Sequence, residues 1–128
     1  MILADTSVIV DCLRGKDLKL QALIPLLPVA VCGVTRAEVL CGSRDAAHRQ
    51  KLLAILAALQ AVPIPEAIWT EVGDNWATLR VGGVTVPFQD LLIASVAIVN
   101  AIELWTRDIH FGHIQRILPA LHLYREPP

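Results

Sequence analysis

Four acidic residues of this chain stand at positions where carboxylates can meet and do chemistry. Asp5 ends an apolar run at the start of the chain, and Asp108 ends another near its C-terminal end. Glu38 and Asp90 each stand in the first turn of an expected helix. Because a helix that leads back to a parallel strand begins at the carboxyl edge of the sheet, all four carboxylates are expected on one rim.

Carboxylates that converge in this way repel one another unless something compensates their charge. Carboxylate oxygens are hard ligands that suit Mg²⁺ or Mn²⁺, with water completing an octahedron. A cation held there can activate water and stabilise charge on a phosphoryl group. The spacing of the acids therefore indicates metal-assisted hydrolysis of a phosphoester.

Each acid also has a purely structural interpretation. Thr35 and Glu38 match a capping box, which would make Glu38 part of a helix start. Asp5 and the two hydroxyl residues after it match simple helix-start chemistry, in which Thr6 and Ser7 cap the following helix. Asp90 and Asp108 match first-turn acids that the helix dipole favours. Four acids on one rim nevertheless favour a metal site over four independent caps.

The elements that would position these acids alternate along the chain. Short apolar, β-branched runs predict strands at 1–5, 29–32, 61–65, 102–106 and 121–124. The third of them holds Pro63 and Pro65 and suits an edge of the sheet. Amphipathic or buried patterns predict helices at 8–13, 18–27, 35–42, 45–59, 66–79, 88–100 and 111–117. Strands that alternate with helices predict an α/β fold with a parallel sheet.

Composition limits the class of protein. The 128 residues suit one domain, and the chain is 55% hydrophobic with a mean hydropathy of +0.56. A sheet covered by helices on both faces explains this apolarity, as does a surface that binds a partner. A net charge of −1 gives no basic footprint of a passive nucleic-acid binder.

The cysteines and the apolar runs bear on the compartment. Three cysteines without a CxxC motif predict neither a zinc site nor disulfides, and they favour a reducing cytoplasm. No signal peptide is expected before the first strand. The longest apolar run, 91–99, is about half the length of a membrane span, so we expect no membrane segment.

Four blocks of this sequence together resemble the motifs of a known family. They are MILADTSVI at 1–9, TRAEVLCG at 35–42, DLLIA at 90–94 and LWTRDIHF at 104–111. In order and spacing they resemble the motif blocks of PIN-domain ribonucleases, and among these the VapC toxins of toxin–antitoxin modules. The resemblance spans nearly the whole chain, and the ordered set of four is what makes it specific.

The resemblance implies a single PIN domain over 1–128, a three-layer α/β/α sandwich with a mainly parallel sheet of about five strands. It implies an endoribonuclease that depends on Mg²⁺ or Mn²⁺ and leaves a 5′-phosphate and a 3′-hydroxyl on RNA. It also implies a VapB-like antitoxin and a toxin homodimer, or a larger toxin–antitoxin assembly. The residues that match the acidic quartet and the hydroxyl positions beside it are Asp5, Glu38, Asp90, Asp108, Thr6, Ser7 and Thr106.

One departure from the family pattern follows the last acid. His110 stands where many relatives carry another acid or a basic residue, which bears on the occupancy of a second metal. His110 and His113 are three residues apart and can share a helix face near Asp108. Both therefore have two interpretations, a contact with substrate or metal and a surface or packing role.

Arginines and tryptophans leave similar alternatives open. Arg36, Arg80 and Arg107 are candidate phosphate contacts, with a solvated charge as the ordinary interpretation. The three tryptophans suit the core or an interface better than a platform for stacking bases, and they are Trp69, Trp76 and Trp105.

Other functional classes fit less well. A haloacid-dehalogenase-type phosphatase needs a second Asp where Ser7 stands, and a receiver domain needs a late lysine, whereas Lys51 is the last one. Two alternatives within the same fold remain open, namely a housekeeping RNA-processing nuclease and a catalytically silent PIN-like binding protein.

Overall fold

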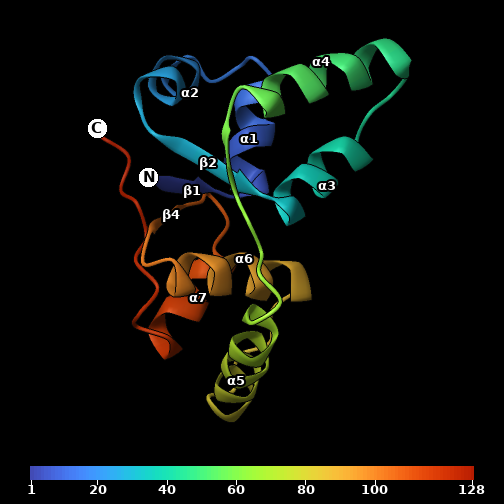
Figure 1. The fold of residues 1–128 in the computed structure, drawn as a ribbon. Helices are drawn as coiled ribbons and strands as arrows, with labels where there is room; N and C mark the ends of the chain where they lie inside the picture. Colours follow the sequence, from blue (N-terminus) through green and yellow to red (C-terminus); the bar gives the residue numbers. More distant parts are fainter.

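A parallel four-stranded sheet forms the centre of the molecule in the computed structural model, which describes residues 1–128 (Figure 1). Its strands are β1 (Ile2–Ala4), β2 (Val29–Cys32), β3 (Gln60–Val62) and β4 (Glu103–Trp105). The order across the sheet is β3-β2-β1-β4, and every neighbouring pair is parallel. The α/β prediction is confirmed, and β3 lies at an edge as its neighbouring prolines predicted.

The predicted fifth strand is wrong. The segment 121–124 forms a single parallel bridge, between Leu123 and Leu104 of β4. Leu104 donates its N–H to the carbonyl of His122, and Tyr124 donates its N–H to the carbonyl of Leu104, both at 2.8 Å. The C-terminal segment therefore contacts β4 at one point only and continues to Glu126, whose carboxylate pairs with Arg107.

Seven α-helices and one 3₁₀ turn connect the strands. They are α1 (Thr6–Leu13), α2 (Leu18–Leu23), the 3₁₀ turn η1 (Ile24–Leu26), α3 (Gly33–Cys41), α4 (Ala46–Ala57), α5 (Ile68–Val81), α6 (Phe88–Val99) and α7 (His110–Ile117). The helix predicted at 18–27 stops early because Pro25 lacks an N–H and cannot continue an α-helix. Each of the other predicted helices is present within a few residues of its expected bounds.

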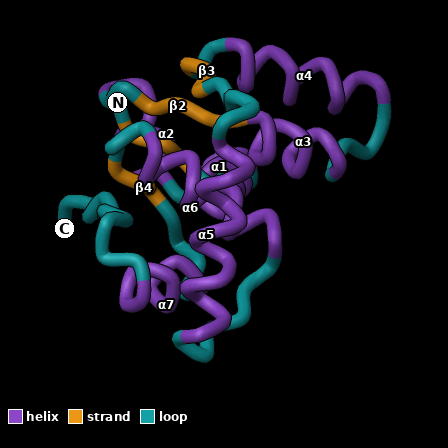
Figure 2. Tube along the Cα trace, turned by 60° about the horizontal axis from the view of Figure 1, so that its bottom comes forward, coloured by secondary structure: helices purple, strands orange, loops and turns teal.

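The helices form two layers, one on each face of the sheet (Figure 1). Side chains along β1 alternate, so that Leu3 packs with α5, α6 and α7, whereas Ile2 and Ala4 pack with α1 to α4. The rotated view in Figure 2 separates α3 and α4 from α5 and α7. The structure is thus a three-layer α/β/α sandwich, and coverage of both sheet faces accounts for much of the apolar composition.

Helix α6 is the most deeply buried helix, with its residues 91–97 all in the core. It leads the chain into β4, and Asp90 lies in its first turn at the carboxyl edge of the sheet. No helix of the structure combines the length and the apolar character that a membrane span requires.

Candidate active site

Asp5 lies directly after β1, beside the end of the neighbouring strand β4. Its backbone N–H donates to the carbonyl of Trp105 at 3.0 Å, which extends the ladder between the two strands by one residue. The next strand along the chain, β2, pairs with β1 on one side, and β4 pairs with β1 on the other side. Asp5 therefore stands at the switch point of the sheet, where ligands of open α/β folds bind.

Asp5 is a buried residue, only 3% exposed, and its carboxylate accepts three hydrogen bonds. Oδ1 accepts from the Ser7 hydroxyl at 2.6 Å and from the Val8 N–H at 3.2 Å, and Oδ2 accepts from the Thr106 hydroxyl at 2.6 Å. Burial raises the pKa of Asp5, these hydrogen bonds oppose that effect, and the charge of Asp108 adds to it. The site thus holds a carboxylate in a fixed orientation at an electrostatic cost.

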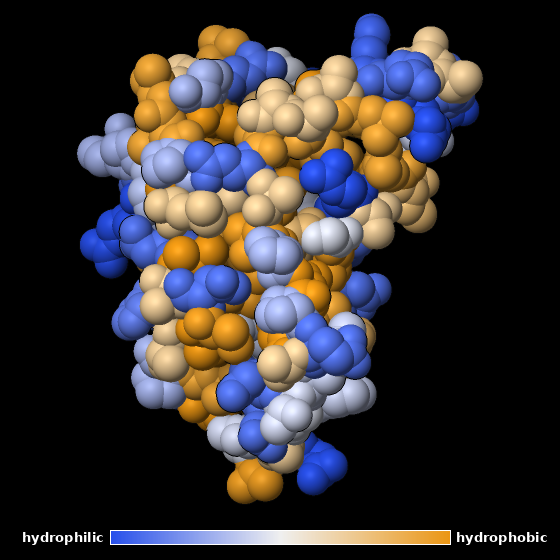
Figure 3. All heavy atoms as spheres, in the orientation of Figure 1, coloured by the Kyte–Doolittle hydropathy of each residue, from blue (hydrophilic) through white to orange (hydrophobic).

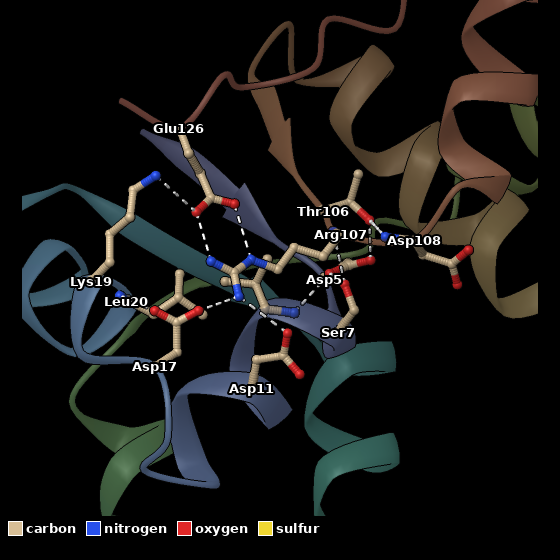
Figure 4. A network of polar contacts seen from close by, with 11 residues as sticks. Asp5, Ser7, Asp11, Asp17, Lys19, Leu20, Thr106, Arg107, Asp108 and Glu126 are labelled. Atoms are coloured by element: carbon tan, nitrogen blue, oxygen red, sulfur yellow. Dashed lines mark hydrogen bonds and ion pairs between the residues drawn. The ribbon is translucent and has the colours of Figure 1, made fainter. Parts of the chain in front are cut away.

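The two hydroxyl groups tie Asp5 to the segment after β4 (Figure 4). Ser7 accepts a hydrogen bond from the Arg107 N–H at 3.0 Å, and Thr106 accepts one from the Asp108 N–H at 2.9 Å. The prediction that Thr6 and Ser7 cap the first helix is wrong, because the Asp5 side chain itself is the N-cap. Both residues lie inside α1, and they orient carboxylates instead.

Asp90 and Asp108 meet around His110. The His110 Nδ1 atom lies 2.9 Å from Oδ2 of Asp90 and 3.3 Å from Oδ1 of Asp108. One ligand atom from each of these three residues lies within 4.8 Å of the others. Burial raises the pKa of Asp90, the hydrogen bond from His110 lowers it, and the charges of Asp108 and Glu38 raise it further.

Glu38 reaches the rim from α3, where its Oε1 accepts a hydrogen bond from the Thr6 hydroxyl at 2.7 Å. The capping-box interpretation is wrong, because α3 begins at Gly33 with Cys32 as its N-cap. Thr35 is fully buried within the helix, and its hydroxyl has no hydrogen-bond partner. Glu38 is therefore directed toward the other acids rather than toward its own helix start.

The structure places the four predicted acids along one rim, close enough for their charges to affect one another. Carboxylate oxygens together with one imidazole nitrogen form a donor set that fits a small divalent cation. The compact three-residue group contains Asp90 and Asp108, while Asp5 and Glu38 lie around it. Sequence reasoning identified the four acids but did not place His110 between two of them.

Comparison with known proteins supports the same family. The family model described as "PIN domain" matches residues 2–117. The chain belongs to the PIN domain family.

Relatives of this PIN domain include "Ribonuclease VapC10" from Mycobacterium tuberculosis, which is 30% identical over 123 residues, 93% of this chain and 92% of that protein. The structure is similar to VapBC2 from Rickettsia felis bound to a DNA fragment from its promoter, with a TM-score of 0.83 and 26% identity over 97% and 98% of the two chains. It also shares its fold with VapBC-1 from nontypeable Haemophilus influenzae, with a TM-score of 0.81 and 19% identity over 97% of each chain. The resemblance predicted from the four sequence blocks is confirmed.

A groove of about 560 Å³ begins at Glu38 and runs between α1, α3 and α4 of this PIN domain. Apolar side chains contribute its walls, namely Val10, Leu13, Val39 and Leu52. Three basic side chains, Arg14, Arg44 and His48, also line it. Figure 3 shows apolar atoms and a hollow beside α3 and α4, with polar residues around it. The sequence alone did not indicate these three residues, because they are contributed by separate elements.

Arg107 does not lie free as a phosphate contact. Its guanidinium binds carboxylates of Asp11, Asp17 and Glu126, and in Figure 4 it points away from Asp108. These contacts lower the pKa values of Asp17 and Glu126 and raise that of Arg107. Arg107 therefore joins α1, the start of α2 and the C-terminal segment to the end of β4.

The remaining candidates divide between core and surface. Trp105 is completely buried, whereas Trp69 and Trp76 on α5 are 45% and 54% exposed. His113 lies exposed on α7 and, unlike His110, is not part of the three-residue group. Arg36 lies in α3 and Arg80 in the last turn of α5.

Proposed function

We propose that this PIN domain is the toxin of a toxin–antitoxin module, a metal-dependent endoribonuclease that hydrolyses phosphodiester bonds of RNA. The observation that carries the proposal is the rim on which four carboxylates from distant parts of the chain converge. A 30%-identical relative named as a ribonuclease supports the substrate class. Because the proposed substrate is cellular RNA, we place its activity in the cytoplasm.

Asp5, Glu38, Asp90 and Asp108 would hold Mg²⁺ or Mn²⁺, either directly or through water. A divalent cation bound there would lower the pKa of a water molecule and neutralise charge that develops on the phosphoryl oxygens. The raised pKa values of Asp5 and Asp90 support this role, because buried carboxylates without a cation are costly.

Three hydroxyl groups would keep the acids in their working orientation. Thr106 and Ser7 each donate to a different oxygen of Asp5, and Thr6 donates to Glu38. Such contacts fix the direction of the carboxylate lone pairs, as outer contacts of metal ligands commonly do. We assign these residues a positioning role rather than direct contact with RNA.

The groove beside Glu38 suits the RNA next to the scissile phosphate. Its arginines can bind phosphate oxygens, and its apolar wall offers a surface for a base. We propose that Arg14 and Arg44 contact the RNA backbone as it leaves the acidic rim. These local basic groups reconcile RNA binding with a net charge of −1 for the chain.

A VapB-like antitoxin is the proposed partner, because the similar solved structures include VapBC complexes. We propose that a basic side chain of the antitoxin enters the acidic rim and blocks it. A complex in which the rim stays open would contradict this mode of inhibition. We further propose a toxin homodimer, for which the exposed Trp69 and Trp76 on α5 and the adjoining Phe88 offer an apolar surface.

The decisive experiment incubates the purified chain with total RNA, with and without Mg²⁺ or Mn²⁺, and maps the ends of the fragments. We expect cleavage only with the cation, and fragments that carry 5′-phosphates. A chain that binds the cation but cleaves no RNA would instead support the catalytically silent alternative. Cleavage confined to precursor RNAs, with no toxicity on expression, would favour the housekeeping nuclease.

A further inference from the structure

His110 presents a nitrogen donor to the two acids that form the compact group. Its Nδ1 lies 2.9 Å from Oδ2 of Asp90 and 3.3 Å from Oδ1 of Asp108. The ring therefore faces the carboxylates, although its side chain is 40% exposed and has solvent available. Nothing in the function proposed above requires an imidazole at this position.

The position of the ring is held by the local structure. The His110 backbone N–H donates to Oδ1 of Asp108 at 2.9 Å, which links the start of α7 to that acid. The next residue, Phe111, and Ile114 one turn further along are fully buried and anchor α7 in the core. The Asp90 side chain comes from α6, which is also buried. The three donors are thus held by well-packed elements: Asp90 by α6, His110 by α7 and Asp108 by the short loop before α7.

The kind of donor affects which cation is preferred. Mg²⁺ binds almost entirely through oxygen and keeps several waters, whereas imidazole nitrogen suits transition metals. A set of two carboxylates and one imidazole therefore favours a transition-metal cation over Mg²⁺ more strongly than carboxylates alone would.

We infer that His110 Nδ1 is a direct ligand of the divalent cation in this PIN domain and makes the site selective for Mn²⁺ over Mg²⁺. The inference rests on the proposed function, which places the cation among Asp5, Glu38, Asp90 and Asp108. On binding, Nδ1 gives its lone pair to the cation, and the ring carries its remaining hydrogen on Nε2. Any hydrogen that Nδ1 shared with Asp90 moves to solvent.

The first test detects the nitrogen directly in the unaltered protein. Mn²⁺ is bound to the full chain, and electron spin echo spectroscopy measures its coupling to ¹⁴N. We expect a nitrogen coupling that disappears in His110→Ala and persists in His113→Ala, which removes an exposed histidine of the same helix. Bound Mn²⁺ without any ¹⁴N coupling in the unaltered protein would overturn the inference without need of a variant.

The second test measures selectivity by calorimetric titration with Mn²⁺ and with Mg²⁺. We expect His110→Ala to weaken Mn²⁺ binding by about 10-fold or more while Mg²⁺ binding changes by less than about 3-fold. Equal losses for both cations, or no loss for either, would refute the selectivity.

A third variant separates this inference from the proposed function. If the cations bind the unaltered protein and Asp90→Asn abolishes their binding, the metal site stands whatever His110 contributes. If neither cation binds, or if binding persists in Asp90→Asn, the metal-dependent function itself fails, together with the role of His110.

Discussion

Replacing Asp5 with asparagine removes one negative charge from the rim and leaves the shape of the side chain unchanged. The new Oδ1 can still accept from Ser7 and Val8. The new amide can donate to the Thr106 hydroxyl oxygen, which accepts one hydrogen bond from Asp108 and has a second lone pair. All three contacts of the side chain can therefore persist, the third with donor and acceptor exchanged.

The effect on stability follows from the raised pKa of Asp5. Because the folded protein disfavours the ionised carboxylate, Asp5 stabilises the fold at pH values below its ordinary pKa of 3.8, and this contribution is lost as pH rises through the raised pKa. At pH 7 the carboxylate is therefore a net cost, which asparagine removes. We expect the Tm of Asp5→Asn without metal to stay equal or rise by up to about 4 °C, equivalent to about 1 kcal/mol.

Whereas stability is expected to stay equal or rise in Asp5→Asn, metal binding and RNA cleavage are expected to fall. Asp5 lies outside the compact group of three, so its loss is expected to weaken Mn²⁺ binding by about 10- to 100-fold. We expect RNA cleavage to fall by at least about 100-fold, a loss of about 2.7 kcal/mol in transition-state stabilisation. The assay compares initial rates on one RNA at saturating Mn²⁺, beside thermal melts of the same preparations.

A matched control is Asp74→Asn, which changes an exposed acid on α5 in the same way. It should leave the cleavage rate and the metal affinity unaltered. Cleavage by Asp5→Asn within about 3-fold of the parent rate would refute the catalytic assignment. A Tm that falls by more than about 8 °C would refute the electrostatic argument, because asparagine can keep the helix cap and removes only the charge.

Other parts of the structure lead to further expected results. Arg107→Met should lower the urea midpoint of unfolding at pH 7, because three carboxylates lose their shared partner. The pairing lowers the pKa of Asp17 and of Glu126, so its contribution is present at neutral pH and is lost as pH falls through the lowered values. The difference in stability between the variant and the parent should therefore shrink in acid. Arg44→Ala should raise KM for RNA by about 3- to 10-fold and weaken its salt dependence, with unchanged Mn²⁺ binding, if the groove carries the RNA backbone. Trp76→Ser should raise the dimer Kd by about 10-fold in sedimentation experiments, whereas an unchanged value would exclude this face of α5 as the dimer surface. Mn²⁺ should raise Tm more at pH 7.5 than at pH 5, because protons compete for Asp5 and Asp90, whose pKa values are raised; a shift equal at both pH values would contradict that competition.

Local patterns in the chain were sufficient to predict most of the scaffold. Apolar runs that end on Asp5 and Asp108 marked β1 and β4, and Pro63 and Pro65 marked the edge strand β3. Such patterns work because a buried parallel strand needs apolar side chains on both faces, and this requirement is visible in a few consecutive residues. The predicted strand at 121–124 failed because its pairing depends on how the segment lies beside β4, and the structure brings only Leu123 into register with Leu104.

The roles of individual polar residues depended on neighbours that the sequence does not identify. Thr35 and Glu38 have the spacing of a capping box, and only the actual start of α3 at Gly33 excluded it. His110 and His113 have similar local surroundings, yet the packing of α7 places only His110 beside the acids.

By itself the sequence determined the α/β class, the order of the elements and the four acids at the ends of strands and the starts of helices. Tertiary structure decided that Arg107 serves Asp11 and Asp17 rather than a phosphate, since these partners lie 96 and 90 residues away along the chain. It also decided that His110 completes a donor set and that a basic groove adjoins Glu38. The physical reason is the same in each case. Helix and strand formation depend on nearby residues, whereas hydrogen bonds, ion pairs and ligand sets depend on distances that exist only after the layers have packed.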